Sequence, residues 1–414
     1  MSRSDPRCRS CGAALTRTLV DLGEQPLANA YLTDAQLSAG REPSYPLHAR
    51  VCDTCWLVQV DDVVPPEAIF TEYAYFSSYS DSWVEHSRRY CKQVIDRLGL
   101  DHQSLVIEVA SNDGYLLRHF VDEGVPVLGV EPAANVAEVA RAAGVPTEVR
   151  FFGWECAADL VDRGQTADLV VANNVLAHVP DLDDFIRGLA GAMKPGGALT
   201  IEVPHLLRML ERVEFDTIYH EHFSYFSLLA ACHALKTRGL RVFDVEELST
   251  HGGSMRLWIG LDATCPFEKT EAVDSIIEAE RTAGLDQANA YAAFAGRVEH
   301  ARASLRGFLV DAREAGKRVA AYGAAAKGNT LLNSCHVTTS DVAYVVDRNP
   351  HKQGQYLPGS HLPILEPDHV RRDRPDYLLI LPWNLREEIT EQMADVHEWG
   401  CRFVVAIPEV EVLA

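Results

Sequence analysis

One short segment of the chain carries an unusual density of side chains that can transfer protons. The segment, FDTIYHEHFSYF, holds Tyr219, His220, Glu221, His222 and Tyr225. A neutral imidazole, with a pKa of about 6.5, accepts a proton at cellular pH, and a tyrosine hydroxyl can donate a hydrogen bond to a developing oxyanion. We therefore interpret this segment as catalytic, with His220 and His222 as competing candidates for the base.

Two other interpretations of the segment stay open. Two histidines and a glutamate could ligate a metal ion, although the His-Glu-x-x-His spacing is absent. The segment could also be a polar surface loop. A second polar loop, THGGSMR at residues 250–256, could close over the same cleft.

Four cysteines near the start of the sequence form two Cys-x-x-Cys pairs. Cys8 and Cys11 form the first pair, and Cys52 and Cys55 form the second. Four thiolates complete the tetrahedral shell that structural zinc prefers, so we predict a closed zinc site that holds the fold and does no chemistry. The alternatives are four unrelated buried cysteines or a redox pair. We expect a small β-rich module to fill residues 12–51.

The sequence VIEVASNDGYLL, which begins at Val106, predicts a strand, a tight turn and the start of a helix. The turn lacks the glycines of a Gly-x-Gly-x-x-Gly loop, because Ala110 and Asn112 replace two of them and only Gly114 remains. Glu131 ends the next predicted strand, where a carboxylate can accept hydrogen bonds from ribose hydroxyls. The alternative for Glu131 is an ordinary loop carboxylate.

Two later segments extend this predicted nucleotide site. VANNVLAHVP follows a strand, and the turn MKPGG leads into the next one. A glycine-poor loop, an acidic strand end and a late Lys-Pro-Gly-Gly turn match the pattern of S-adenosylmethionine-dependent methyltransferases. A dinucleotide-binding fold is the second choice, because its first turn usually keeps more glycines. The residues expected to contact the cofactor are Glu108, Ala110, Asn112, Gly114, Glu131, Pro132, Asn173 and Asn174.

A second glycine-containing loop, VAAYGAAAKGNT, follows a predicted strand in the last part of the chain. Gly323 and Gly328 have the spacing of a Walker A loop, but Asn329 stands where that loop requires lysine, so ATP hydrolysis is not expected. The N–H groups of the following helix could still bind a diphosphate, with charge from Lys327. The alternative is a purely structural α/β domain. The expected substrate contacts are Tyr322, Gly323, Lys327, Asn329, Asp347 and Asn384.

The predicted elements arrange these motifs along the chain. Strands are expected at 105–109, 127–130, 169–172, 198–203, 318–322, 342–346, 377–381 and 403–407. Strands that alternate with helices predict doubly wound parallel sheets, whereas residues 204–262 look less regular. We expect an α/β protein with three domains: a zinc-binding module at 1–70, a Rossmann-like methyltransferase domain at 71–262 and a second α/β domain at 263–414.

The composition excludes several classes of protein. The 414 residues are 47% hydrophobic and 23% charged, as in an ordinary globular chain of two or three domains. A formal net charge of -21 opposes binding to nucleic acids or anionic membranes. Apart from the two pairs the cysteines are scattered, and neither a signal peptide nor a membrane-spanning run is visible. We therefore expect a cytoplasmic protein, and a monomer.

Together these motifs resemble a known family over nearly the whole chain. The family is the S-adenosylmethionine-dependent C-methyltransferases that act on nucleotide-linked keto-deoxysugars in antibiotic pathways. The chain looks most like the C-3'-methyltransferases that make branched sugars such as tetronitrose or kijanose. The resemblance covers both cysteine pairs, VIEVASNDGYLL, the Asn-Asn-x-x-x-His strip, YHEHFSYF, THGGSMR and YGAAAKGN. The family often has glycine at the position of Ala110.

The resemblance implies a chemistry and a set of roles. The 4-keto group of a dTDP-linked sugar acidifies the neighbouring C3–H, a base removes that proton, and the enolate takes the methyl group of S-adenosylmethionine. His222 matches the base, while Tyr219, Glu221 and His178 match positions that orient it or stabilise the oxyanion. Tyr73 matches an active-site tyrosine, and the last domain would help to hold the nucleotide.

Other functions stay open. The enzyme could methylate C5 or an oxygen of a similar sugar nucleotide. The chain could also be a zinc-ribbon interaction protein with a degenerate methyltransferase domain, although the intact YHEHFSYF segment argues against degeneracy.

Overall fold

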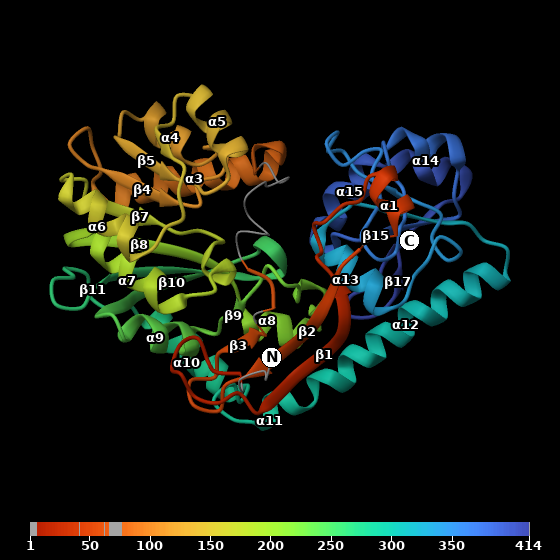
Figure 1. Ribbon diagram of the computed structural model, residues 1–414, viewed down its shortest axis with the longest axis horizontal. Coiled ribbons are helices and arrows are strands. Elements are labelled where there is room, and N and C mark those ends of the chain that lie inside the picture. Colours follow the sequence, from red (N-terminus) through yellow and green to blue (C-terminus); the bar gives the residue numbers. More distant parts are fainter. Residues whose placement is uncertain (1–5, 41, 62, 66–76, 414) are drawn as a thin grey trace.

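The part of the chain that the structure describes forms three β-sheets, which helices cover (Figure 1). The computed structural model describes residues 6–40, 42–61, 63–65 and 77–413. Tyr73, expected in the active site, lies outside these residues. Within them, no helix has both the length and the apolar character needed to cross a membrane.

The first sheet is small and antiparallel. Its strand order is β1 (Arg17–Pro26), β2 (Ser44–Val51), β3 (Val58–Val60) and β9 (Ser224–Tyr225). The β-rich module expected between the cysteine pairs is therefore confirmed. Strand β9 belongs to the predicted catalytic segment, so this sheet connects distant parts of the chain, and the domain boundaries at 70 and 262 stay proposals. Helix α1 (Asp34–Ala39) begins with a capping box between Thr33 and Gln36.

The second sheet is the large central one, and its order is β10-β11-β8-β7-β4-β5-β6. The neighbours from β8 to β6 are parallel, while β11 runs antiparallel to both β8 and β10. The strands are β4 (Val106–Val109), β5 (Val127–Val130), β6 (Thr147–Glu148), β7 (Ala167–Val171), β8 (Met193–Pro204), β10 (Leu240–Leu248) and β11 (Ser254–Leu261). The predicted α/β class with a Rossmann-like sheet is confirmed.

Helices cover both faces of this sheet. Val106 packs into one hydrophobic core and Ile107 into another, because successive side chains of β4 point to opposite faces. Both faces are apolar, as expected for buried parallel strands. The helices are α3 (Asp81–Leu98), α4 (Leu117–Asp122), α5 (Ala134–Ala142), α6 (Trp154–Asp162), α7 (Leu182–Ala192) and α9 (Leu228–Lys236).

The antiparallel hairpin of β10 and β11 corrects the expectation that residues 204–262 are less regular than the preceding segment. Arg256 lies in the middle of β11, is buried, and interrupts the apolar pattern that would have predicted this strand. Its guanidinium pairs with Glu202 of β8 at 2.5 Å and with Glu246 of β10 at 2.8 Å. A buried charge is tolerated when it is paired in this way, so the arginine ties three neighbouring strands together.

The third sheet has the order β14-β13-β12-β15-β16-β17 and is parallel except at β17. Its strands are β12 (Val319–Tyr322), β13 (Val345–Val346), β14 (Ile364–Leu365), β15 (Tyr377–Ile380), β16 (Arg402–Val405) and β17 (Glu411–Val412). Its helices are α13 (Ala326–Ser334), α14 (Asp368–Asp373) and α15 (Arg386–Gln392). The second α/β unit is therefore present, although β13 is shorter than expected.

Helices α10 (Glu271–Thr282), α11 (Asn289–Ala292) and α12 (Phe294–Glu314) connect the two larger sheets. In Figure 1 the long α12 runs beneath the blue carboxyl-terminal part, and β1 and β2 lie between the two larger sheets. One hydrophobic core includes Leu47 of β2, Leu210 of α8 (Leu206–Arg212), Leu305 of α12 and Leu379 of β15. The first sheet and the last domain therefore share a core.

Candidate functional site

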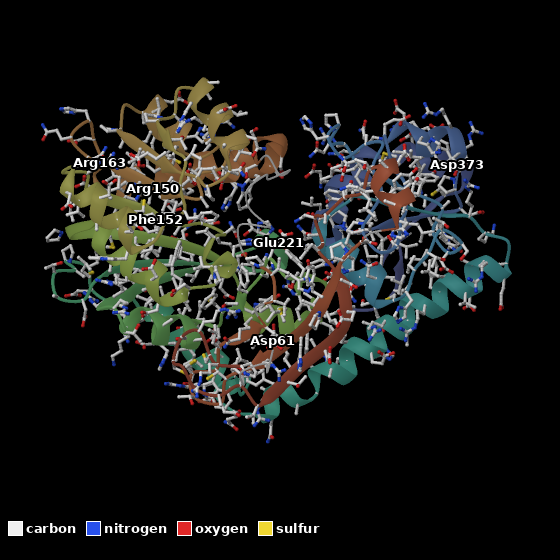
Figure 2. All side chains as sticks on the ribbon, in the orientation of Figure 1. Asp61, Arg150, Phe152, Arg163, Glu221 and Asp373 are labelled. Atoms are coloured by element: carbon white, nitrogen blue, oxygen red, sulfur yellow. The ribbon has the colours of Figure 1, made fainter. Side chains whose placement is uncertain are left out.

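One large cavity lies where the three sheets meet, and its volume is about 790 Å³. Its lining includes Asn29 from the first part of the chain, Glu131 at the carboxyl end of β5, and Lys327 from α13. Ligands of doubly wound sheets bind outside the carboxyl ends of the parallel strands, and this cavity occupies that place. Figure 2 shows Glu221, another lining residue, between the central sheet and β1.

The cavity collects most of the site residues expected from the sequence. Those that line it are Ala110, Asn112, Glu131, Pro132, Asn173, Asn174, His178, Tyr219, Glu221, His222, Lys327 and Asn384. The expected site residues not among the described lining residues are Glu108, Gly114, Tyr322, Gly323, Asn329 and Asp347.

Glu131 organises the loop that follows β4. One oxygen of its carboxylate accepts from the backbone N–H of Asn112, and the other accepts from that of Ala133, both at 2.9 Å. Ala110 and Asn112 have φ angles of 58° and 50°, so the loop turns through left-handed conformations. Burial raises the pKa of Glu131. The lone pairs that these bonds leave on the carboxylate can accept hydroxyl groups of a nucleoside.

Two other residues that were expected to contact the cofactor belong to the same region but are not among the described residues that line the cavity. Glu108 is buried on β4, and burial, followed by the charges of Glu131 and Asp113, raises its pKa well above the usual value. Gly114 has a φ of 75°, and a Cβ there would meet Val145 at 3.0 Å, so its glycine fits a tight turn against a neighbouring loop. Both residues shape the loop, and neither is among the described residues that line the cavity.

The Asn173–Asn174 strip is tied to the neighbouring strand β8. The Asn173 side-chain oxygen accepts from the N–H of Glu202 at 3.1 Å, and the N–H of Asn174 donates to the Glu202 carbonyl at 2.7 Å. These bonds fix the strip where it enters the cavity.

His222 is held in one tautomer by its two neighbours. Its Nδ1 lies 2.9 Å from the carbonyl oxygen of Thr217, which can only accept, so Nδ1 carries the proton. Its Nε2 therefore accepts, and the hydroxyl of Tyr219 donates to it at 2.7 Å. Burial, and then the neighbouring His178, lowers the pKa of His222 well below its usual value. The imidazole is thus neutral, and its unprotonated nitrogen is Nε2.

A second neutral imidazole lies beside the first. His178 Nδ1 donates to the carbonyl oxygen of Glu221 at 2.8 Å, and the rings of His178 and His222 lie 4.7 Å apart. Burial lowers the pKa of His178 to about 4. His251 also lines the cavity, and burial together with the charge of Lys327 lowers its pKa to about 4. Three neutral imidazoles at one cavity suit proton transfer.

The side chain of Glu221 is bound by a residue that sequence reasoning missed. The Asn29 amide nitrogen lies 2.9 and 2.8 Å from the two carboxylate oxygens. Burial raises the pKa of Glu221 to about 7. Asn29 carries no motif, and no signal in the sequence could have linked it to a residue so distant along the chain.

His220, the competing candidate for the base, lies elsewhere. It is buried, its ring packs edge-on against Tyr45 of β2 at 6.0 Å, and it is not among the described residues that line the cavity. His222 and His220 therefore face different surroundings, and of these two only His222 is among the described residues that line the cavity.

On the carboxyl-terminal side, Lys327 and Trp383 form a linked pair. The Lys327 ammonium donates to Asn384 Oδ1 at 2.7 Å and lies 4.4 Å from the centre of the Trp383 ring. The Trp383 indole N–H in turn donates to Asp216 at 2.7 Å. Burial lowers the pKa of Lys327, and the charges of Asp216 and Glu214 oppose this effect.

Asp216 and Glu214 are further residues that the sequence analysis missed. Burial raises the pKa of Asp216 to about 6. Burial, and then the charge of Asp216, raises the pKa of Glu214 to about 8. They lie shortly before the YHEHFSYF segment in the sequence. This closeness was the only feature of the sequence that could have identified them as site residues.

The glycines of the Walker-like loop are explained by packing. A Cβ at Gly323 would lie 2.5 Å from Pro382, and one at Gly328 would lie 2.8 Å from Leu381. The other residues expected at this substrate site have structural partners. Asn329 donates to the Ala28 carbonyl, Asp347 accepts from the N–H groups of Ala324 and Asn349, and the Tyr322 hydroxyl donates to Gln392.

A second lysine reaches the cavity near this loop. Lys352 lines it, donates to the Ala324 carbonyl at 2.8 Å and lies 5.1 Å from the centre of the Tyr31 ring. Lys327 and Lys352 are the only lysines or arginines among the described lining residues. Lys352 was not among the site residues predicted from the sequence.

The two cysteine pairs form one cluster. The Sγ atoms of Cys8, Cys11, Cys52 and Cys55 all lie within 4.8 Å of one another. The distances are 3.5 Å from Cys8 to Cys55 and 3.4 Å from Cys11 to Cys52, close to the roughly 3.8 Å edge of a tetrahedron of sulfurs about 2.3 Å from zinc. The Gln59 amide donates to the Cys8 sulfur at 3.3 Å, the kind of outer contact that supports a thiolate ligand. The cluster thus has the donors and the geometry for a closed zinc site.

Comparisons with known proteins find three successive matches along the chain. Residues 8–70 match a putative zinc binding domain, 83–245 a methyltransferase domain, and 249–408 a C-methyltransferase C-terminal domain. C-methyltransferase NovU of Streptomyces niveus is 37% identical over 407 residues, which cover 98% of this chain and 96% of that protein.

Other similarities are confined to part of the chain. A ubiquinone biosynthesis O-methyltransferase of Methylobacterium nodulans is 34% identical over 96 residues, 22% of this chain and 37% of that protein. The structure of magnesium protoporphyrin IX methyltransferase from Synechocystis with bound S-adenosylmethionine covers 48% of this chain and 98% of its own, with 15% identity and a TM-score of 0.35.

The near full-length relationship and the three domain matches decide the family. The cofactor is S-adenosylmethionine, and the four-cysteine cluster is a zinc-binding site. This chain belongs to the S-adenosylmethionine-dependent C-methyltransferases that carry an amino-terminal zinc-binding domain and a dedicated carboxyl-terminal domain.

Proposed function

We propose that this C-methyltransferase methylates C3 of a dTDP-linked 4-keto-deoxysugar in the biosynthesis of an antibiotic sugar. The motifs of the sequence support the substrate class. The observation that carries the proposal is the neutral His222, whose Nε2 is paired with the Tyr219 hydroxyl at the cavity wall. A carbon acid needs a positioned base together with a donor for the oxyanion, and this pair supplies both.

The proton transfer follows from this pair. The ketone oxygen of the bound sugar takes the hydrogen bond of the Tyr219 hydroxyl, which leaves Nε2 of His222 open to the C3–H. His222 accepts that proton while the Tyr219 donor stabilises the charge on oxygen. The Thr217 carbonyl, bonded to Nδ1, stabilises the imidazolium that results. His178 packs against His222 and keeps its ring in place.

The cofactor side of the cavity would orient the methyl donor. S-adenosylmethionine supplies an electrophilic methyl group when it is bound. Glu131 accepts the ribose hydroxyls, and Asn112 and Asn173 hold the loops around the cofactor. Glu131→Ala should weaken S-adenosylmethionine binding by about 1–3 kcal/mol, measured by calorimetry, because hydroxyl partners are left unpaired. Unchanged affinity would contradict the assignment.

We place the diphosphate of the sugar nucleotide at the start of α13. Ala325, Ala326 and Lys327 line the cavity at the start of α13, and Lys352 lies beside them. A helix N-terminus with two lysines favours a diphosphate. Lys352→Met should raise the KM for the sugar nucleotide without changing S-adenosylmethionine affinity, and Lys352→Arg should restore much of it. An unchanged KM would remove Lys352 from the site.

Hydrogen exchange tests the base directly. With S-adenosylhomocysteine in place of the donor, the enzyme should exchange the C3 hydrogen of a dTDP-4-keto sugar with deuterated water. His222→Ala should lose this exchange and about 10²–10⁴-fold in kcat. His220→Ala is the matched control from the same segment and should keep the exchange. Wild-type exchange by His222→Ala would show that another group, with His178 tested next, is the base.

The position of the methyl group can be read from the product. A 4-ketone acidifies both C3–H and C5–H, so the carbon that faces His222 determines the outcome. Transfer from ¹³C-methyl-labelled S-adenosylmethionine, followed by NMR of the product, should place the label on C3. A label on C5 or on oxygen would replace the proposed regiochemistry while leaving the assignment as a methyltransferase intact.

We also propose that the enzyme works as a monomer in the cytoplasm. None of the ten cysteines forms a disulfide in the structure, in keeping with a reducing compartment. Light scattering of the purified protein should give the mass of one chain, and a dimer would contradict the monomer.

A further inference from the structure

We infer that the first zinc knuckle positions the catalytic histidine through Arg9. Arg9 lies between the ligands Cys8 and Cys11. Its guanidinium donates to the carbonyl oxygen of Phe223 at 2.8 Å and to that of Val60 at 2.9 Å. Phe223 directly follows His222, so the metal loop is bonded to the backbone beside the proposed base.

The same arginine is fixed to the zinc site at its other end. The backbone N–H of Arg9 donates to the Gln59 side-chain oxygen at 3.0 Å, and the Gln59 amide donates to the Cys8 sulfur at 3.3 Å. A zinc-bound thiolate is a stronger acceptor than a thiol, because charged acceptors form the stronger hydrogen bonds. A bound zinc ion would therefore strengthen the hydrogen bond between Gln59 and Cys8 and would order the loop that carries Arg9.

The strand that leaves the second knuckle completes this connection. Gln59 pairs with Ser224 between β3 and β9, and the Val60 N–H donates to the Phe223 carbonyl at 3.1 Å. The Phe223 carbonyl thus accepts from both Val60 and Arg9, and the Arg9 guanidinium also lies 5.3 Å from the centre of the Phe223 ring. The pairing of β3 with β9 ends at Ser224. Arg9 therefore binds the backbone at Phe223, between strand β9 and the turn that carries His222.

This inference rests on the proposed function of His222 as the base. Arg9→Met removes both donors to the carbonyl oxygens and leaves the four zinc ligands in place. A displacement of about 1 Å in a catalytic group costs about 10²-fold, so kcat should fall roughly 10- to 100-fold. Zinc content, measured by mass spectrometry of the metal, and S-adenosylmethionine affinity should match wild type. Arg9→Lys, which keeps one charged donor, should recover part of the lost kcat.

Arg7→Met is the matched control. The Arg7 side chain is exposed and donates to the Gly12 carbonyl at 3.0 Å within the same knuckle, with no bond to the catalytic segment among its described contacts. This variant should keep the wild-type kcat. An equal loss in both variants would mean that disturbance of the knuckle, and not the clamp on Phe223, causes the effect, and would overturn the inference.

A measurement independent of turnover separates this inference from the assignment of the base. In protein labelled with ¹⁵N-histidine, the ring signals of His222 are identified by their loss in His222→Ala. Arg9→Met should shift or broaden these signals, and Arg7→Met should leave them unchanged. Unchanged His222 signals together with an unchanged kcat in Arg9→Met would refute the positioning role. Retained hydrogen exchange by His222→Ala would instead refute the base, whatever Arg9 does.

Discussion

The hydroxyl of Tyr219 donates a hydrogen bond to Nε2 of His222 across 2.7 Å, and the two rings lie 4.0 Å apart. The free enzyme therefore keeps its proposed base occupied by its proposed oxyanion donor. Binding of the acceptor has to exchange this bond for two bonds to the substrate. The arrangement prevents the buried imidazole from being left unpaired between turnovers.

Loss of the Tyr219 hydroxyl should slow the chemical step. We expect Tyr219→Phe to lower kcat about 10²-fold, the lower end for removal of an oxyanion donor. Tyr225→Phe is the control, because its hydroxyl bond, to the Thr217 carbonyl, is long at 3.4 Å. It should lose less than about tenfold. Steady-state kinetics on the same acceptor check both values, and a Tyr219→Phe variant as fast as wild type would leave the hydroxyl without a role in the step.

Glu221→Gln should stabilise the protein at neutral and alkaline pH. Burial raises the folded-state pKa of Glu221 from 4.5 to about 7, so the folded state binds a proton that the unfolded state releases. The stability that this residue contributes is full below about pH 4.5 and is lost as pH rises through 7. Glutamine keeps an oxygen for Asn29 and has no charge to bury. The variant should gain up to about 3 kcal/mol over wild type at pH 8 and little at pH 4.5.

Melting temperatures of Glu221→Gln and wild type across this pH range provide the measurement. Glu138 is exposed on α5, and Glu138→Gln is the matched control, with no expected change in the pH dependence. A difference between Glu221→Gln and wild type that stays constant from pH 4.5 to 8 would argue against a buried, titrating Glu221.

Ala110→Gly should preserve or raise stability, which is unusual for a glycine substitution. The φ of Ala110 is 58°, a left-handed conformation that costs an alanine about 1–2 kcal/mol and costs glycine little. The greater freedom of glycine in the unfolded chain offsets about 0.4–1 kcal/mol of that gain. Ala279→Gly, on the exposed side of α10, should instead lose about 1 kcal/mol. Denaturant titrations compare the two, and equal losses would speak against a strained loop.

Gly252→Ala should disturb the contact between the methyltransferase sheet and the last domain. Its φ is 94°, and a Cβ there would lie 2.5 Å from Trp383 and 2.6 Å from the Glu214 carboxylate. We expect a KM for the acceptor raised about tenfold or more, since Trp383 supports Lys327, while S-adenosylmethionine affinity is kept. Gly124→Ala, with a φ of 75° and open space around it, carries the backbone strain without the clash. A normal KM in Gly252→Ala would show that Trp383 and Glu214 can move away from the added Cβ without loss of acceptor binding.

Cys52→Ser should reduce the yield of folded protein. Wild type should hold about one zinc per chain, and the variant should lose most of it, because a structural site with three thiolates binds the metal far more weakly. Metal analysis and circular dichroism of the soluble fraction check this. Full zinc content and normal stability in the variant would exclude a four-cysteine site.

Most of the parallel strands were predictable because they are short apolar runs between turns, whereas the two-residue parallel strands β6 and β14 were not predicted. The expected strand at 127–130 has the same limits as β5. The hairpin of β10 and β11 was not predicted, since charged Arg256 and Glu246 lie within it and are paired only across strands. The pattern of apolar and charged residues along one strand does not show which residues of other strands will form ion pairs with it.

The candidate site also contains residues that the sequence predicted and residues that it did not. The YHEHFSYF segment was visible in the sequence, and the family resemblance matched His222 to the base, while the residue types alone left His220 as a competitor. Of the two, only His222 is among the described residues that line the cavity. Asn29 could not be linked to Glu221 without the structure, since the two are 192 residues apart in sequence. The glycines of the Walker-like turn could have served a phosphate or close packing. Their neighbours Pro382 and Leu381, which favour packing, come from a different strand end.

The core shared by the first sheet and the last domain limits how this enzyme can be recombined. Leu47, Leu210, Leu305 and Leu379 are each at most 6% exposed, and they pack into one cluster drawn from four distant stretches of chain. A chimera that exchanges only the last domain with a relative would juxtapose apolar surfaces that did not evolve together. Grafts intended to change the specificity for the methyl acceptor should therefore carry the first sheet along with the last domain, and keep the central sheet of the recipient.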